Sequence, residues 1–257
     1  RTARVFTRRV DADGIRRVPD DLIVEEPMSI RLDGELVATT MRTPGDDFEL
    51  AVGFCLTEGV LHDAPVRTVR YCGQGSAAES EYNDVTVDTG GLAPTPTPRL
   101  GPASSSCGVC GTVAISELLD RLCPLDMAPF DLAVLAGLAD RIDGQALFTT
   151  TGAVHAAVAF DRTGQPLLIR EDIGRHNAVD KVVGRLKMDG RLPAGDLGLW
   201  VSGRASFEMA QKAWAAGFAC LVAVSGPSAL AVETARVANL QLAGFARGDR
   251  LNLYTGD

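Results

Sequence analysis

The sequence lacks the features of several common classes of protein. It carries 33 Asp and Glu against 25 Lys and Arg, a formal net charge of −8, so the basic face of a general nucleic-acid-binding protein is missing. No apolar run approaches the roughly 20 residues that cross a bilayer. No signal peptide is recognisable, although the chain begins with Arg1 rather than Met. We therefore expect neither nucleic acid nor a membrane among the partners.

Cysteine and histidine are also scarce, which limits the metal sites and disulfides of the chain. Six cysteines in 257 residues do not make a disulfide scaffold, and this usage fits a reducing cytoplasm. Cys107 and Cys110 form a single Cys-x-x-Cys pair, whereas a closed zinc site needs four ligands. A zinc deaminase would place His-x-Glu before such a pair, but His155 follows it and precedes two alanines. Structural zinc is therefore the weaker interpretation, and we expect no metal.

The cysteine pair is nevertheless the most informative stretch that is present. Two thiols at this spacing can bind one metal ion, form a short disulfide, or share a sulfur atom between a carrier and a resolving position. Serines and glycines around Cys107 and Cys110 predict an exposed loop. A helix is expected to follow, and its N-terminus would favour a thiolate at Cys110. A thioredoxin-like pair is less well supported, because a proline-rich segment and not a strand precedes the cysteines.

The first part of the chain is predicted to be rich in β-structure. Its strand-like runs are residues 22–30, 35–41, 66–71 and 84–87. The dipeptide Asp33-Gly34 between the first two predicts a hairpin. A helix is expected to start after Asp46 or Asp47 and to stop at Gly59. We divide the chain into a β-rich part over residues 1–90 and a loop rich in Pro, Gly and Ser over residues 91–111, which carries the cysteines.

Helices and strands alternate in the remainder, residues 112–257. Helical periodicity covers residues 113–122, 131–140, 178–186, 207–216 and 229–243. Strand-like runs cover residues 146–160, 167–170, 197–201, 220–224 and 251–254. This alternation predicts an α/β (α+β) fold, with a mixed sheet and flanking helices.

Three loops follow strands of this predicted sheet, where ligands of α/β proteins usually bind. They are residues 171–177, 202–206 and 225–228, and the last two repeat a Val-Ser-Gly strand end before a helix. Backbone N–H groups there can bind a phosphate, and Arg204 can add a forked cation. Ordinary tight turns with serine caps are the alternative.

The charged residues around the first of these loops admit two readings. His176 follows a strand end, and Asp180 lies one helical turn further on, where it can orient the imidazole ring. A surface ion pair is an equal alternative. Lys181 and Arg185 are expected on a solvated face, and His155 in or near the core, because its neighbours are apolar.

Five motifs, in order along the chain, together resemble the formate dehydrogenase accessory sulfurtransferase family (FdhD). They are Thr-Pro-Gly-Asp-Asp-Phe-Glu-Leu-Ala-Val-Gly-Phe (43–54), Ser-Ser-Ser-Cys-Gly-Val-Cys-Gly (104–111), Arg-Glu-Asp-Ile-Gly-Arg-His-Asn-Ala-Val-Asp-Lys (170–181), Ser-Gly-Arg-Ala-Ser-Phe-Glu (202–208) and Gly-Phe-Ala-Arg-Gly-Asp-Arg (244–250). The Cys-x-x-Cys pair alone would not be specific, but the combination is.

The resemblance implies a function. A member of this family is a cytoplasmic protein that accepts persulfide sulfur from a cysteine desulfurase. It passes the sulfur to the molybdenum bis(molybdopterin guanine dinucleotide) cofactor, which is its bound substrate, before that cofactor enters formate dehydrogenase. The resemblance also implies a homodimer and a later domain similar to cytidine deaminases, without their zinc.

The resemblance assigns roles to residues as well. Cys107 would carry the persulfide and Cys110 would assist, although the expected helix favours Cys110 as the more acidic thiol. The family's cofactor-binding segment corresponds to Phe245, Ala246, Arg247, Gly248, Asp249 and Arg250. The phosphates of a guanine dinucleotide also suit Arg204 and His176. The alternative is a non-catalytic chaperone that binds and delivers the cofactor without carrying sulfur.

Overall fold

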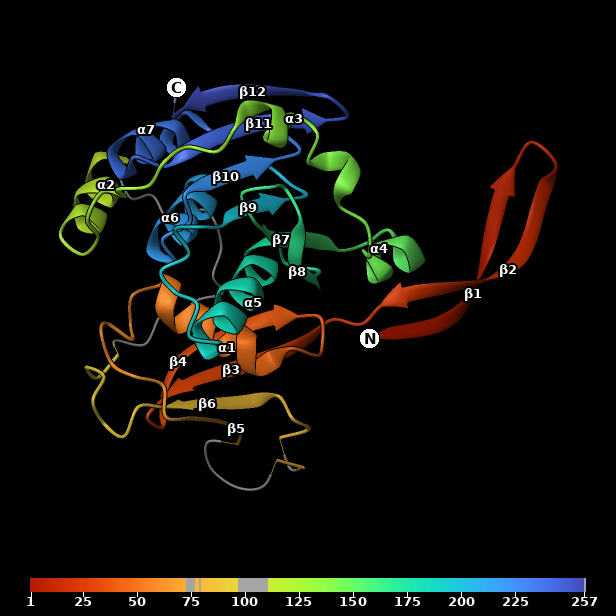
Figure 1. Cartoon of the computed structure of the whole chain (residues 1–257). Coiled ribbons are helices and arrows are strands. Elements are labelled where there is room, and N and C mark those ends of the chain that lie inside the picture. Colours follow the sequence, from red (N-terminus) through yellow and green to blue (C-terminus); the bar gives the residue numbers. More distant parts are fainter. Residues whose placement is uncertain (73–76, 79, 97–110, 257) are drawn as a thin grey trace.

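The computed structural model describes residues 1–72, 77–78, 80–96 and 111–256, and Figure 1 draws the whole chain. The predicted cysteine loop, with Cys107 and Cys110, lies outside the described residues. Within the described part the strands form three sheets, with the orders β1-β2, β4-β3-β6-β5 and β12-β11-β10-β9-β7-β8. The structure is therefore a mixed α/β fold, as the alternation of helices and strands predicted.

The chain begins with a hairpin that the sequence did not predict. Strand β1 (Thr2–Asp11) pairs antiparallel with β2 (Gly14–Ile23), and Val10 lies opposite Ile15 beside the turn. The hairpin projects from the rest of the molecule in Figure 1. Its apolar residues are interrupted by arginines and aspartates, so neither strand has the clean alternation of a half-buried strand.

The β-rich part that the sequence predicted forms the four-stranded sheet. It contains β3 (Glu26–Leu32), β4 (Glu35–Arg42), β5 (Thr68–Tyr71) and β6 (Asp84–Asp88). The β3–β4 hairpin turns at Asp33 and Gly34, both with positive φ, as the Asp-Gly dipeptide predicted. Helix α1 (Asp47–Thr57) covers one face through apolar residues such as Leu50 and Val52, which are fully buried with Ile30.

The six-stranded sheet carries the rest of the fold. Its strands are β7 (His155–Phe160), β8 (Pro166–Asp172), β9 (Gly198–Val201), β10 (Cys220–Ala223), β11 (Gln241–Arg247) and β12 (Arg250–Thr255). Strands β9, β10 and β11 are parallel, while β7 is antiparallel to both β8 and β9. The carboxyl ends of β8, β9, β10 and β11 and the amino end of β7 therefore share one edge, which we call the carboxyl edge.

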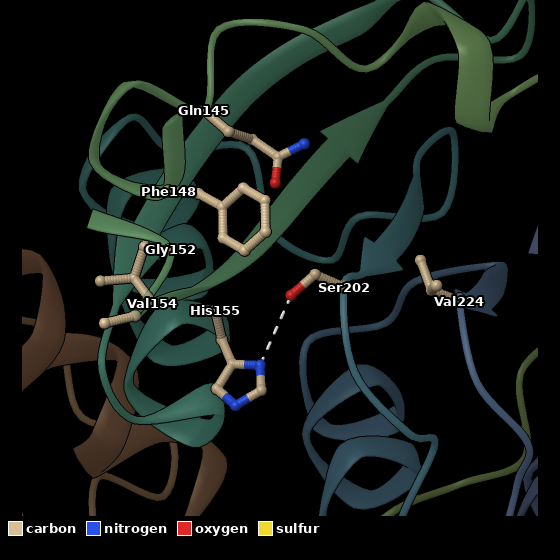
Figure 2. Close-up of a pocket in the computed structure, with 8 residues that line it drawn as sticks. Gln145, Phe148, Gly152, Val154, His155, Ser202 and Val224 are labelled. Atoms are coloured by element: carbon tan, nitrogen blue, oxygen red, sulfur yellow. Dashed lines mark hydrogen bonds between the residues drawn. The ribbon is translucent and has the colours of Figure 1, made fainter. Parts of the chain in front are cut away.

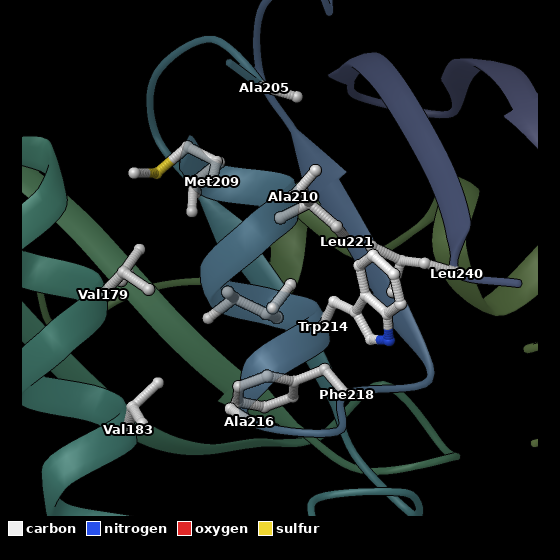
Figure 3. Packing of buried hydrophobic residues seen from close by; sticks show 14 of the residues in the cluster. Val179, Val183, Ala205, Met209, Ala210, Trp214, Ala216, Phe218, Leu221 and Leu240 are labelled. Carbon is white, nitrogen blue, oxygen red and sulfur yellow. The ribbon is translucent and has the colours of Figure 1, made fainter. Parts of the chain in front are cut away.

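Helices cover both faces of this sheet. Helices α5 (Arg175–Met188), α6 (Phe207–Ala215) and α7 (Ala229–Ala238) bury one face, and Figure 3 shows Val179, Val183, Met209 and Trp214 within that layer. The other face packs against a segment with α3 (Leu132–Ala136) and the 3-10 helix η1 (Ala139–Arg141). The remaining helices are α2 (Gly111–Leu119) and α4 (Ala146–Thr151).

Two predicted elements differ from the structure. Residues 146–151 were expected to be strand but form α4, because the Glu171 carboxylate accepts the N–H groups of Leu147 at 3.0 Å and Phe148 at 2.8 Å and so caps the helix. The last helix was expected to run to residue 243 but ends at Ala238. Asn239 then adopts a left-handed conformation (φ 54°), and the chain enters β11.

The two sheets are joined where α1 crosses α5. Gly53 and Gly184 face each other there, and a Cβ on Gly184 would lie 1.8 Å from the backbone oxygen of Glu49. Arg170 beside them donates to both carboxylate oxygens of Glu49, with Nη2 2.9 Å from Oε1. The β-rich part and the six-stranded sheet are therefore closely packed against each other.

Candidate functional site

The loops that the sequence singled out meet at the carboxyl edge. The loop after β10 is hydrogen-bonded to the loop after β9, with the N–H of Ser225 3.1 Å from the Gly203 oxygen and that of Ser228 3.0 Å from the Ala205 oxygen. The N–H of Phe245 on β11 donates to the Ser225 oxygen at 3.3 Å. Three segments that are distant in sequence therefore form one continuous surface.

A pocket of about 540 Å³ opens beside these loops. It is lined by Gln145, Phe148, Gly152, Ala153, Val154, His155, Ser202 and Val224. Figure 2 shows the Phe148 ring and the Gln145 amide pointing into the space in front of Ser202. The pocket thus combines an aromatic ring with amide, imidazole and hydroxyl groups, as ligand sites commonly do.

His155 lies in this pocket and not in the apolar core where the sequence placed it. Its Nδ1 is 3.5 Å from Ser202 Oγ, which accepts the N–H of Ala156 at 3.0 Å. Burial lowers the pKa of His155, and the positive charges of Arg175 and His176 lower it further. The imidazole is therefore neutral at pH 7 and can accept or donate a hydrogen bond.

Of the two readings of His176, the structure agrees with an ion pair and not with orientation of the ring by Asp180. The Nε2 of His176 lies 3.9 Å from Oε2 of Glu208, whereas Asp180 is buried and bound to Lys212 Nζ at 2.9 Å. His176 is the main cause of the lowered pKa of Glu208, about 2, so that carboxylate is ionised at neutral pH. Asp180 cannot orient the His176 ring, because the Asp180 side chain points into the protein interior, toward Lys212.

Buried polar atoms that make no hydrogen bond gather at the starts of α5 and α6, although His176 Nε2 among them faces the Glu208 carboxylate at 3.9 Å. Within the described residues, the buried atoms Arg175 Nε, His176 Nε2 and Ser206 Oγ have no hydrogen-bond partner. Neither helix has a side-chain cap, since Gly174 and Ser206 stand at the two N-cap positions without capping bonds. Unpaired donors at two helix N-termini suit an anion such as a phosphate.

Other residues of the same motifs hold the fold together. Lys181, expected on a solvated face, is fully buried, and its Nζ lies 2.7 Å from Asp172 Oδ2 and 3.0 Å from the Thr43 oxygen. Lys212 Nζ likewise contacts both Asp180 and Thr57 Oγ1. Buried charges need such partners, so Asp172, Asp180 and Lys181 of the motif over residues 170–181 connect the β-rich part to the six-stranded sheet.

The predicted cofactor-binding segment lies on β11 and the turn into β12. Phe245 is half exposed with φ 54°, and a Cβ on Gly226 would lie 2.8 Å from its ring. Ala246 is buried in the core, so its side chain is not available to a ligand. The remaining predicted residues are all exposed, namely Arg204, Arg247, Gly248, Asp249 and Arg250. The structure therefore brings Phe245 to the loop surface and leaves these arginines in solvent.

After the cysteines, the described part of the chain begins again at Gly111, on the side of the six-stranded sheet opposite its carboxyl edge. Helix α2 starts at Gly111, and the segment after it is fixed by the Leu125 N–H, 2.8 Å from the Ala238 oxygen at the end of α7. Trp214 Nε1, near the end of α6, donates to the Cys123 oxygen at 2.8 Å. Figure 1 shows α2 beside these helix ends, far from α4, whose Phe148 lines the pocket.

Several residues of the site were missed from the sequence. Phe148 was assigned to a strand and Gln145 lay outside the predicted elements, so no pocket wall was expected from them. Arg175 and Ser206 lay in loops that had been singled out, but nothing in the sequence indicates that their polar atoms are buried without partners. Only the packing around a side chain decides that property.

Two features that the described residues lack bear on the predicted classes of protein. No group of three or more His, Cys, Asp or Glu side chains converges in a way that could hold a metal ion. Cys107 and Cys110 lie outside the described residues, so the absence of zinc stays a prediction. None of the helices in the same part of the chain has both the length and the apolar character to cross a bilayer.

The fold and the carboxyl edge define an α/β protein with a pocket, and with buried polar atoms that make no hydrogen bond, at one edge of a mixed sheet. Residues 23–257 match the FdhD/NarQ family. The chain therefore belongs to the FdhD/NarQ family, as the motifs predicted.

Relatives agree with this assignment, and a solved structure has a similar fold. The chain is 45% identical to the sulfur carrier protein FdhD of Streptomyces avermitilis, across all of this chain and 94% of the relative. It is 44% identical to that of Corynebacterium efficiens, across 93% of this chain and 90% of the relative. A crystal structure described as a formate dehydrogenase accessory protein, from Desulfotalea psychrophila, matches with a TM-score of 0.76 at 22% identity, over 99% of this chain and 96% of that one. This last match concerns the fold alone.

Proposed function

We propose that this protein is a sulfur carrier for the maturation of formate dehydrogenase in the cytoplasm. It accepts sulfur from a cysteine desulfurase and transfers it to the molybdenum bis(molybdopterin guanine dinucleotide) cofactor. The observation that carries the proposal is the near-full-length similarity to relatives that are named sulfur carrier proteins. The three-part division at residues 90 and 111, with a deaminase-like later domain, belongs to the same proposal.

Cys107 and Cys110 carry out the proposed sulfur transfer. The Cys107 thiolate attacks the terminal sulfur of the desulfurase persulfide, forms a new S–S bond, and releases the desulfurase cysteine as a thiolate. The Cys110 thiolate then attacks the inner sulfur of the Cys107 persulfide. A Cys107–Cys110 disulfide forms, and the terminal sulfur leaves as hydrosulfide for the cofactor, so the two thiolates supply its two electrons. A cellular dithiol reduces the disulfide before the next cycle.

The carboxyl edge is the proposed cofactor site. The guanine dinucleotide carries phosphates, which suit the donors of Arg175 and Ser206 that make no hydrogen bond at the starts of α5 and α6, beside His176. Arg204, Arg247 and Arg250 are exposed around the same edge and can add forked contacts to phosphate oxygens. The half-exposed ring of Phe245 offers a face on which a guanine can stack.

The position of α2 constrains how sulfur reaches that site. Cys107 precedes Gly111 by four residues, a length of chain that spans at most about 14 Å. Gly111 begins a helix on the side of the sheet away from the pocket. Sulfur loading and cofactor binding are therefore proposed to occur on different sides of the protein, and the hydrosulfide has to pass between them.

Mass spectrometry of the full chain tests the carrier role. After incubation with a cysteine desulfurase and cysteine, the peptide that contains Cys107 is expected to gain one sulfur atom. Cys107→Ala should abolish this gain and the maturation of formate dehydrogenase. Cys123→Ala is the matched control, because Cys123 is exposed and its side chain has no assigned role. An unmodified Cys107 in a protein that still binds the cofactor would indicate the non-catalytic chaperone instead.

A further inference from the structure

The β1–β2 hairpin, which we call the arm, reaches away from the molecule. Each strand has ten residues, so the arm is about 33 Å long. Its root is held by the Val24 N–H, 2.9 Å from the Arg1 oxygen, and by an ion pair of 2.6 Å between Arg1 and Asp46. Figure 1 shows the arm extending from the side where α4 lies. An isolated two-stranded hairpin is at best marginally stable in water, so a projecting arm of this length needs a surface to cover it.

The arm exposes apolar side chains on both faces. Phe6, Val10 and Ile15 share one face and are 63%, 72% and 68% exposed. Val5 and Leu22 share the other face and are 38% and 48% exposed. Scattered apolar residues on a protein surface are ordinary, but a row of them on each side of a two-stranded arm is typical of an interaction surface.

Arginines lie opposite one another in the middle of the arm. Arg8 pairs with Arg17 across the strands and Arg9 with Arg16, an arrangement of like charges that destabilises an isolated hairpin. Arg16 is bound to Asp11, and the Arg17 guanidinium lies 4.5 Å above the Phe6 ring. No carboxylate in the described residues lies within ion-pair distance of Arg8 or Arg9. An acidic surface from outside the arm would relieve this repulsion.

The remainder of the chain supplies the opposite charge. Residues 1–19 contain six arginines and two aspartates, whereas the rest of the chain contains 31 acidic and 19 basic residues. Residues 126–143, which we call the acidic strip, have four exposed aspartates, Asp126, Asp131, Asp140 and Asp143, against one exposed arginine, Arg141. Met127 and Leu132 in the strip are 37% and 48% exposed, so the strip is apolar as well as acidic.

We infer that the arm of one copy docks on the acidic strip of a second copy. The strip leads directly into α4, and the arm extends from the same side of the molecule. Two copies related by a two-fold axis can then exchange arms, so that each arm covers the strip of the other copy. The exposed residues of the arm pack against Met127 and Leu132 of the partner copy, and the unpaired arginines meet its aspartates. This inference does not depend on the sulfur chemistry.

A reciprocal charge exchange tests the contact in the full-length protein. The arm variant carries Arg8→Glu and Arg9→Glu, and the strip variant carries Asp140→Lys and Asp143→Lys. All four side chains are exposed, so both variants should fold, which circular dichroism verifies. Sedimentation at low salt should give a dimer dissociation constant at least about tenfold weaker for each variant alone. Arg191→Glu and Asp120→Lys, also exposed, are the matched controls and should leave dimerisation unchanged.

Mixing the two variants gives the decisive result. A glutamate-bearing arm then meets a lysine-bearing strip, and an unchanged arm meets an unchanged strip, so mixing should restore dimers of wild-type affinity. A monomeric wild-type protein would overturn the inference. So would variants that dimerise like the controls, or a mixture that stays as weak as its components. An arm that instead binds an acidic partner protein would give one of these three results.

Discussion

The close crossing of α1 and α5 predicts that replacing a glycine there by alanine lowers the stability of the protein, the opposite of the usual effect in a helix. Replacing glycine by alanine inside a helix normally stabilises a protein by roughly 0.5–1 kcal/mol, because alanine restricts the unfolded chain. At Gly184 the added Cβ would lie 1.8 Å from the backbone oxygen of Glu49, where an ordinary contact is 3.4–4 Å. The helices would have to separate by roughly 1.5–2 Å, because a backbone atom of α1 cannot rotate away.

Overpacking of this kind typically costs 1–3 kcal/mol. After the gain in helix propensity is subtracted, Gly184→Ala is expected to lower the free energy of unfolding by about 1–2 kcal/mol. Gly53→Ala should do the same, since its Cβ would lie 1.8 Å from the Asp180 oxygen. The double variant should lose less than the sum, because either alanine already separates the helices.

Urea denaturation measures these differences. Trp200 and Trp214 are both buried, so tryptophan fluorescence reports the unfolding of the six-stranded sheet and its helices. Lys187→Ala, on the same helix one turn from Gly184, is the control and should change stability by less than about 0.5 kcal/mol. A Gly184→Ala protein as stable as the wild type, or more stable, would refute the close packing of the two helices.

Two further predictions concern the carboxyl edge. Arg204→Ala or Arg247→Ala should weaken GDP binding by about tenfold in calorimetric titration, because each removes a charged contact to phosphate. Arg191→Ala is the control. Unchanged affinity for GDP in both variants would count against the proposed cofactor site. The pKa of His155 is lowered by burial, so the folded state favours the neutral ring. The contribution of His155 to the free energy of unfolding should therefore be constant above pH 6.5, the ordinary pKa of histidine. It should decrease as the pH drops from 6.5 toward the lower pKa of the folded state. His155→Gln should remove this part of the pH dependence in urea denaturation, and an unchanged profile would contradict the assignment.

The arm and α4 are the elements that the sequence did not predict. Arginines and aspartates interrupt the apolar pattern of residues 2–23, so no period identifies the two strands. Residues 146–151 contain three threonines, which favour strands. They nevertheless form helix α4, because the Glu171 carboxylate on β8 accepts the free N–H groups at the start of the helix. A contact between distant residues thus overrides the local preference.

The sequence by itself determined the family, the alternation of helices and strands, and the loops that follow the strands of the six-stranded sheet. These features depend on local patterns, such as the Asp33-Gly34 turn, apolar periodicity and the motifs around Cys107. The tertiary structure alone decided which charged residues are structural and which are free. Lys181 and Arg175 stand in one motif, yet Lys181 is buried against Asp172 while Arg175 Nε has no hydrogen-bond partner among the described residues. Such a difference depends on which distant side chains pack against each residue, and the local sequence does not contain that information.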